Sequence, residues 1–133
     1  MTDVVDTNEA GIVTRLSPRT VAETVARLTG MLAAKGVHVF AVIDQAEQAR
    51  QVGLDLRETV LVIFGNPVAG TPVMVAEPLA ALDLPLKILV WDDSGQAKVS
   101  YYPAVTLAAR HNLNSGLERR LAIAPIADAL VAP

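Results

Sequence analysis

The chain has no cysteine among its 133 residues. This absence excludes disulfides, thiolate nucleophiles and cysteine-ligated metal sites. Aromatic residues make up only 4% of the chain, although hydrophobic residues make up 52% and the mean hydropathy is +0.39. The apolar content is therefore mostly alanine, valine and leucine. So much apolar surface on a small chain favours burial against a second copy, and we expect a homodimer. The alternative is a monomer with a well-filled core.

The sequence also lacks a concentrated basic region and a long hydrophobic run. It has 11 basic and 14 acidic residues, and its densest basic cluster is Arg119-Arg120. A nucleic-acid backbone requires a concentrated basic face, so we expect no nucleic-acid partner. No apolar run approaches the ~18 residues of a membrane span, and the first residues do not form a signal peptide. We expect one cytoplasmic domain over residues 1–133, without a membrane partner and with residues 1–9 flexible.

What is present is an alternation of strand-like and helix-like segments. The element order is β-α-β-α-β-α-β-β-α-α, and turn residues at 92–96 predict a hairpin that makes at least one pair antiparallel. The predicted fold is α+β: a single two-layer domain with a small mixed β-sheet of about five strands packed with helices. The expected strands are 11–16, 37–43, 59–64, 86–91 and 98–102, and the expected helices are 18–35, 45–52, 72–82, 104–112 and 117–131.

Local signals fix several helix ends. Ser17-Pro18 combines an N-cap residue with proline at the first helical position, and Gly36 follows the end of the same helix. Asp44 stands three residues before Glu47, which is a variant of the capping box. Thr71-Pro72 repeats the pattern of Ser17-Pro18 and predicts another helix start there.

The most conspicuous motif is the glycine-rich segment 64–72, which follows an apolar strand. Gly65 and Gly70 have the spacing of a phosphate-binding loop, but the Lys-Ser/Thr that should follow is replaced by Thr71-Pro72. A nucleotide-hydrolysing loop is therefore excluded. Two readings remain open: N–H groups of residues 68–71 hold a carboxylate or phosphate, or the segment is a tight turn in which Asn66 bonds its own backbone. We include Gly65, Asn66, Gly70 and Thr71 in a candidate ligand site.

Several short segments form a recognisable pattern: Val39-Phe40, Ile43-Asp44, Ala49, Gly53-Leu54, Leu56-Arg57, Phe64-Gly65-Asn66-Pro67, Gly70-Thr71-Pro72, Asp83-Leu84-Pro85-Leu86-Lys87, Val90-Trp91 and Ala108-Ala109-Arg110-His111. Together they resemble the bacterial domain-of-unknown-function family 302, over roughly residues 20–113. The resemblance implies a compact α+β domain, often paired as a dimer, and it implies no function. The chain departs from the family pattern at Gln45, where members often carry histidine, and at Tyr102-Pro103.

Three further side chains are candidates for the same site. Lys87 interrupts an otherwise apolar strand, so it must snorkel, pair with a carboxylate or face a pocket, unless it lies at the sheet rim. His38 is a core or interface residue or a ligand-binding residue, and Asp44 is an N-cap or a general base. We add His38, Asp44 and Lys87 to the ligand site, on condition that their strands are neighbours. His111 is expected on the surface, and no metal site is predicted.

The leading hypothesis is a small ligand- or anion-binding domain that acts as a homodimer and carries no assigned catalytic residue. The ligand and any cofactor are not identified by the sequence. One alternative is an enzyme of an unrecognised class with His38 or Asp44 as its general base. The other is an oligomerisation or interaction protein without a ligand.

Overall fold

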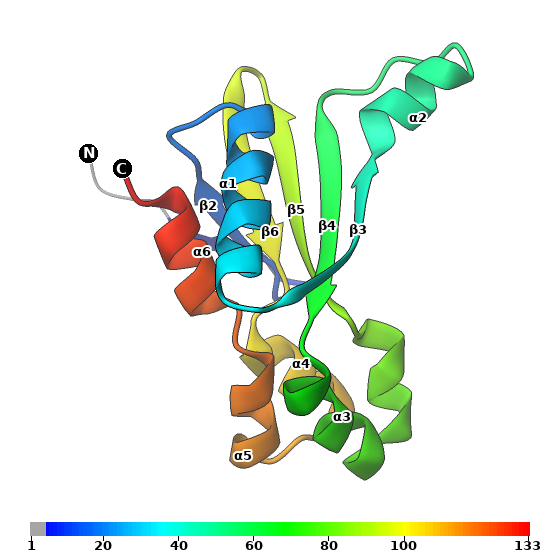
Figure 1. Ribbon diagram of the computed structural model, residues 1–133, viewed down its shortest axis with the longest axis vertical. Coiled ribbons are helices and arrows are strands. Elements are labelled where there is room, and N and C mark those ends of the chain that lie inside the picture. Colours follow the sequence, from blue (N-terminus) through cyan, green and yellow to red (C-terminus); the bar gives the residue numbers. More distant parts are fainter. Residues whose placement is uncertain (1–4) are drawn as a thin grey trace.

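A six-stranded sheet with the order β1-β2-β6-β5-β4-β3 forms the centre of the computed structural model, which describes residues 5–133 (Figure 1). Every neighbouring pair of strands is antiparallel. The strands are β1 (Val5–Thr7), β2 (Val13–Leu16), β3 (His38–Asp44), β4 (Thr59–Gly65), β5 (Leu86–Asp93) and β6 (Gln96–Tyr101). The helices are α1 (Val21–Ala34), α2 (Gln45–Gln51), α3 (Pro67–Ala76), α4 (Ala104–His111), α5 (Ser115–Glu118) and α6 (Ala124–Val131), with the 3-10 helices η1 (Pro78–Asp83) and η2 (Arg119–Leu121).

The predicted α+β class is confirmed, and two details of the sheet differ. Residues 5–7 form an edge strand on β2 where a flexible tail was expected, so the strands number six within residues 5–133; residues 1–4 lie outside the described residues. The sheet is also wholly antiparallel instead of mixed. For the pair of β3 and β4 the reason lies in α2, which at about 10 Å is too short to run back along a strand of roughly 23 Å. The chain therefore reverses direction at the end of β3.

Helix α1 begins at Val21, three residues later than the sequence predicted. Its N-cap is Thr20, whose hydroxyl accepts a hydrogen bond from the Glu23 N–H at 3.1 Å, while the Glu23 carboxylate accepts from the Thr20 N–H at 3.0 Å. This capping box satisfies two backbone donors reciprocally, which a cap at Ser17 would not do. The Ser17 hydroxyl instead bonds the hydroxyl of Thr24 at 2.7 Å, in the buried interior.

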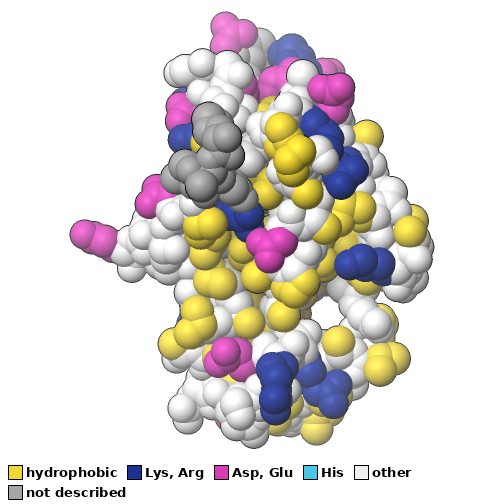
Figure 2. Space-filling model, turned by 90° about the vertical axis from the view of Figure 1, so that its left-hand side faces the viewer, with side chains coloured by type: hydrophobic (Ala, Val, Ile, Leu, Met, Phe, Trp, Pro, Cys, Tyr) yellow, Lys and Arg dark blue, Asp and Glu magenta, His cyan; other side chains and the backbone are white. Residues whose placement is uncertain are grey.

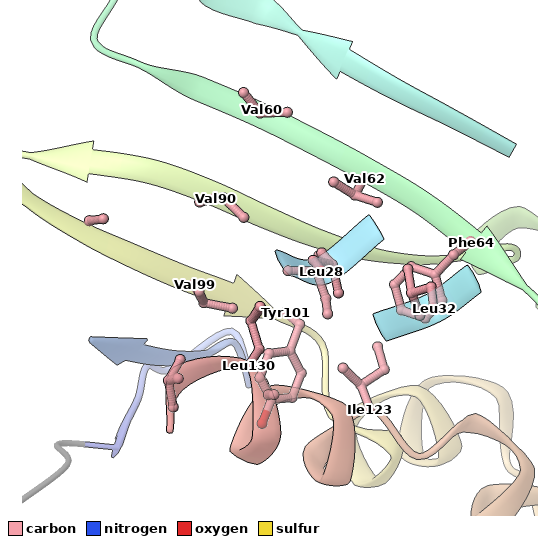
Figure 3. Packing of buried hydrophobic residues seen from close by; sticks show 14 of the residues in the cluster. Leu28, Leu32, Val60, Val62, Phe64, Val90, Val99, Tyr101, Ile123 and Leu130 are labelled. Atoms are coloured by element: carbon pink, nitrogen blue, oxygen red, sulfur yellow. The ribbon is translucent and has the colours of Figure 1, made fainter. Parts of the chain in front are cut away.

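The hydrophobic core lies between one face of the sheet and two helices. Helix α1 packs on β3, β4 and β5, and α6 packs on α1 and β2. Leu28 and Leu32 of α1 are fully buried at the spacing of one helical turn. Figure 3 shows both of them pointing at valines from adjacent strands, with Leu130 of α6 beside them.

The opposite face of the sheet is not covered by α1 and α6. Because strand side chains alternate, the register assigns to this face a band of apolar residues from three neighbouring strands, all of them half-buried except the exposed Ile43. It consists of Ala41, Ile43, Leu61, Ile63, Leu89 and Trp91. Strand β3 was expected to be buried on at least one face, but it is an edge strand on which Phe40, Val42 and Ile43 are exposed.

A helical lobe made of α3, η1, α4, α5 and η2 lies beyond one end of the sheet (Figure 1). It has its own buried cluster, formed by Val73, Ala80, Leu107 and Leu121. Leu86, the first residue of β5, packs against both this cluster and the main core. The junction between lobe and sheet is therefore held by apolar contacts, and the candidate sites lie around it.

Truncating Leu28 should test the position of the main core. We expect Leu28→Ala to lower the free energy of unfolding by about 3 kcal/mol, because it removes a buried side chain and leaves a cavity. Leu79→Ala in η1 is the control, since Leu79 is exposed, and its effect should stay within about 0.5 kcal/mol. Urea denaturation measures both, and equal effects would contradict this assignment of the core.

Candidate functional site

The glycine-rich segment is the end of β4 followed directly by the start of α3. The Asn66 side chain caps this helix by accepting from the Val68 N–H at 3.0 Å, and Pro67 occupies the first helical position. The predicted start at Thr71-Pro72 is wrong, and Pro72 lies inside the helix. Since proline has no N–H, it leaves the Val68 carbonyl without its helical donor. That carbonyl accepts a hydrogen bond from Arg120 at 3.3 Å.

The backbone donors of this segment are used within it. The N–H groups of Ala69 and Gly70 both donate to the Asn66 carbonyl, at 3.0 and 2.9 Å, in addition to the Val68 bond to the Asn66 side chain. A phosphate cradle needs such donors to point outward at the ligand. The geometry therefore matches the tight turn capped by Asn66, and not a backbone anion cradle.

A cavity of about 280 Å³ opens beside the segment, where the sheet meets the helical lobe. Its walls come from segments 64–71, 84–86 and 120–122, and Val37, Phe40, Met74 and Ile126 complete it. All four predicted residues of the motif, Gly65, Asn66, Gly70 and Thr71, belong to this lining. The lining is mainly apolar, and Arg120 is its one charged side chain. On the face of the molecule drawn in Figure 2, Lys and Arg side chains lie at the lower end, over the helical lobe, and hydrophobic side chains lie across the middle.

Gly65 lines this cavity between Phe40 and Pro85. A Cβ added at Gly65 would lie 3.4 Å from the Phe40 ring and 3.5 Å from Pro85. A single carbon would thus touch both neighbours, and a longer side chain would have to displace them or enter the cavity. Alanine would therefore fit at Gly65 by ordinary contacts, and the glycine of the Phe-Gly-Asn-Pro motif excludes only larger side chains.

The other three predicted residues do not gather at this cavity. His38 is nearest: it pairs with Gly65 across the strands, and its exposed ring meets the Phe40 ring edge-on with centroids 4.4 Å apart. Asp44 lies at the other end of β3, where its carboxylate accepts from the Glu47 N–H at 2.9 Å and caps α2 as predicted. Lys87 does not line the cavity and belongs to a separate cleft.

Sequence reasoning missed a cluster of charged side chains between η1 and α4. The Asp83 carboxylate accepts from Arg110 through both oxygens at 2.9 Å and bonds His111 Nε2 at 2.6 Å. The guanidinium of Arg110 also lies 4.7 Å from the centre of the Tyr102 ring. His111 was expected on the surface, yet only 11% of its side chain is exposed. Because 27 residues separate Asp83 from Arg110, no local spacing could have revealed their pairing.

Arg110 and His111 determine the charge state of Asp83. Burial raises the pKa of the Asp83 carboxyl, but hydrogen bonds from His111 and Arg110 outweigh it and hold this pKa below the ordinary value of 3.8. The same hydrogen bond raises the pKa of Arg110. The cluster therefore fastens η1 to the last turn of α4 by charge-assisted hydrogen bonds.

Removing this carboxylate should destabilise the protein in a pH-dependent way. We expect Asp83→Asn to lower the free energy of unfolding by about 2 kcal/mol at pH 7, because it weakens hydrogen bonds to charged groups. A carboxyl whose pKa is lowered by folding stabilises the fold above its ordinary pKa and loses that contribution as the pH falls through the lowered value. The deficit should therefore shrink below pH 3.8.

Urea denaturation at pH 7 and pH 3 measures this effect. Asp93→Asn is the control, since Asp93 pairs with Lys98 at a more exposed position, and its cost should be below about 1 kcal/mol. A deficit of Asp83→Asn that is equal at both pH values would contradict the assignment.

The structure thus defines an α+β domain with one open antiparallel sheet and an apolar cavity at the junction with a helical lobe. The family model described as "Domain of unknown function DUF302" matches residues 13–130. The chain therefore belongs to this family, as its motifs indicated. A crystal structure of an uncharacterised conserved DUF302 protein from Bacillus stearothermophilus has the same fold, with a TM-score of 0.77, 24% identity and coverage of 91% of this chain and 95% of that one.

Two curated relatives are similar in sequence and are much longer. The chain is 39% identical over 116 residues to "Fluoride-specific ion channel FluC 1" of Brucella suis and to the protein of the same name of Brucella abortus. These matches cover 86% of this chain but only 45% and 42% of those proteins. Within residues 5–133, no helix has the length and apolarity that would let it cross a membrane. In the same range, no three His, Asp or Glu side chains are grouped to hold a metal ion.

Proposed function

We propose that the protein binds a small, mostly apolar molecule with one acidic group in the cavity beside Gly65–Thr71. The observation that carries this proposal is the lining: apolar walls with a single cationic side chain, Arg120, at about 280 Å³. Ligand pockets are mostly apolar with a few polar groups that fix orientation, and they commonly measure roughly 300–1,000 Å³. The ligand should therefore be at the small end of that range.

We expect the acidic group of the ligand to bind the guanidinium of Arg120. Its guanidinium donates to the Val68 carbonyl over 3.3 Å, which is long for such a bond. A carboxylate is a stronger acceptor than a carbonyl, because hydrogen bonds between ionised groups are about twice as strong as neutral ones. Binding can therefore replace a weak contact by a strong one without unfolding the loop.

Filling the cavity should abolish binding. Ala69 of α3 lines the cavity, and Ala76 is exposed at the end of the same helix. We expect Ala69→Leu to bind octanoate at least tenfold more weakly in isothermal titration, because the larger side chain occupies the space, while Ala76→Leu binds it as the wild type does. Native mass spectrometry should likewise lose a co-purifying small molecule only in Ala69→Leu. Equal octanoate binding by both variants would reject the proposed site.

Replacing Arg120 should distinguish the contribution of the ligand's acidic group to binding from that of its apolar tail. We expect Arg120→Gln to weaken octanoate binding about tenfold, the effect of losing a hydrogen bond to a charged group, and to leave octanol binding unchanged. Arg119→Gln is the matched control, because Arg119 precedes Arg120 and does not line the cavity. Equal losses of octanoate and octanol binding would instead indicate that the variant has distorted the cavity.

We also propose that the domain acts as a homodimer paired along β3. This edge strand carries no charged residue between His38 and Asp44, although native edge strands are commonly protected by charges. If two copies pair antiparallel about Ala41, His38 faces Asp44 of the second copy and Phe40 faces its Val42. Such pairing would extend the sheet and place unlike polar ends opposite each other.

A charge on the edge should prevent this pairing. We expect Val42→Lys to be monomeric in size-exclusion chromatography with light scattering, because its ammonium would be buried against the second strand. Val52→Lys is the control at an exposed position beyond α2 and should remain dimeric. A wild-type protein that is monomeric up to millimolar concentration would rule out the dimer and leave the ligand site unaffected.

The remaining hypotheses have less support. Asp44 already caps α2, and His38 is about 20 Å away along β3, so a catalytic pair is not favoured. An interaction protein without a ligand would have no use for the cavity. A cytoplasmic location stays a prediction. The channel activity named for the Brucella relatives belongs to proteins of which this chain spans less than half.

A further inference from the structure

A second hollow, of about 190 Å³, lies beside Leu86, which also lines the apolar cavity. We call it the Lys87 cleft. Lys87 and Asp83 contribute its charged groups, and Tyr102 forms a wall. Leu82 and Leu86 contribute apolar surface, and the buried Leu107 and Ile123 lie behind them. Leu86 is the only residue that lines both hollows. The Lys87 cleft therefore differs from the site proposed above in position and in chemistry.

Lys87 has an unusual setting for a lysine. It lies near the start of β5, an interior strand of the sheet, and pairs with Ile63 of β4. Its half-buried ammonium donates to the Pro85 carbonyl at 3.0 Å. Among residues 5–133, no carboxylate lies within 4.0 Å of this ammonium. An ammonium has three donors, so Lys87 retains hydrogen-bonding capacity for a ligand.

The acidic side chain of the cleft is already neutralised. Asp83 accepts hydrogen bonds from Arg110 and His111, as described above. Arg110 in turn rests on the ring of Tyr102, which fixes one wall of the cleft. The positive charge that remains uncompensated in the cleft is that of Lys87. The cleft thus combines one cation that has no paired anion with neighbouring apolar side chains. This combination suits an anion that carries a short hydrocarbon chain.

We propose that the Lys87 cleft binds a small organic carboxylate. The carboxylate accepts a hydrogen bond from the Lys87 ammonium, and the hydrocarbon body rests on Leu82, Leu86 and the Tyr102 ring. Inorganic phosphate fits less well, because phosphate sites usually gather several donors around the anion and offer no apolar floor. This inference does not depend on the cavity beside Gly65–Thr71.

Butyrate is a suitable probe, with butylammonium as a molecule of similar size and opposite charge. We expect butyrate to shift the backbone amide signals of residues 82–87 and of Tyr102 in two-dimensional ¹H–¹⁵N NMR, in a saturable way. Butylammonium and inorganic phosphate should not do so. Equal saturable shifts with butylammonium would overturn the proposal, and a preference for phosphate would show that the site binds inorganic anions instead of organic acids.

Variants test the role of Lys87. Lys87→Gln should weaken butyrate binding about tenfold, and Lys87→Arg should restore most of it, since arginine keeps the cation. Lys98→Gln is the matched control, because Lys98 lies on the same uncovered face of the sheet but pairs with Asp93 at 2.7 Å. Unchanged binding by Lys87→Gln would overturn the proposal. If Lys87→Gln does not fold, two other comparisons test the proposal: butyrate binding by wild type and by Lys87→Arg, and butyrate against butylammonium binding by the wild type. Equal binding of butyrate and butylammonium would overturn it.

One further variant keeps the two sites apart. Ala69→Leu fills the apolar cavity and should leave the butyrate shifts at residues 82–87 unchanged. If Ala69→Leu abolishes them, butyrate binds in the apolar cavity and the Lys87 cleft is not a site. If Ala69→Leu abolishes octanoate binding but not butyrate binding, both proposals are supported.

Discussion

Burial of only one face of the antiparallel sheet is the constraint on which the rest of this structure depends. Helix α1 packs Leu28 and Leu32 into that face, and α6 adds Leu130 beside them. With the core on one side, the chain places its remaining apolar residues elsewhere: in the second cluster of the helical lobe and on the uncovered face around Trp91. The hollows form where this lobe meets the end of the sheet. Both lie beside Leu86, which belongs to the core and to the lobe. Ligand sites at a junction of this kind can form without disturbing the packing of the main core.

Prolines and asparagines shape this junction through the hydrogen bonds that they make or omit. Asn66 caps α3 and uses the first backbone donors of the segment, which removes the possibility of a phosphate cradle. Pro72 leaves the Val68 carbonyl available, and Arg120, which lines the cavity, donates a hydrogen bond to it. The guanidinium of Arg120 is thus held by a helix carbonyl that lacks its usual N–H donor. Asp83 is fixed in a comparable way, by hydrogen bonds from Arg110 and His111 of α4, so that its charge does not neutralise Lys87 in the cleft that both residues line.

Much of the fold could be predicted from local pattern, and the site only in part. The hairpin of β5 and β6, the cap at Asp44 and the glycine after α1 were predicted correctly, because each depends on interactions within a few residues. The start of α1 was misplaced because Ser17-Pro18 and Thr20 both offer caps, and only the reciprocal bond from Glu23 decides between them. The motif residues Gly65 and Gly70 do line a cavity. The pairing of Asp83 with Arg110 and His111 could not be predicted, since distant segments meet there.

The sequence by itself determined the α+β class, the family, the positions of most helices and strands, and the absence of thiol chemistry, because periodicity, capping and composition are local properties of the chain. Only the tertiary structure decided which candidate residues share a site. Gly65, Asn66, Gly70 and Thr71 lie together at the apolar cavity, whereas Asp44 and Lys87 lie apart from it. The physical reason is the sheet order: β3 is an edge strand, so its two ends reach different parts of the surface, and β5 directs Lys87 to the face that the core helices leave uncovered.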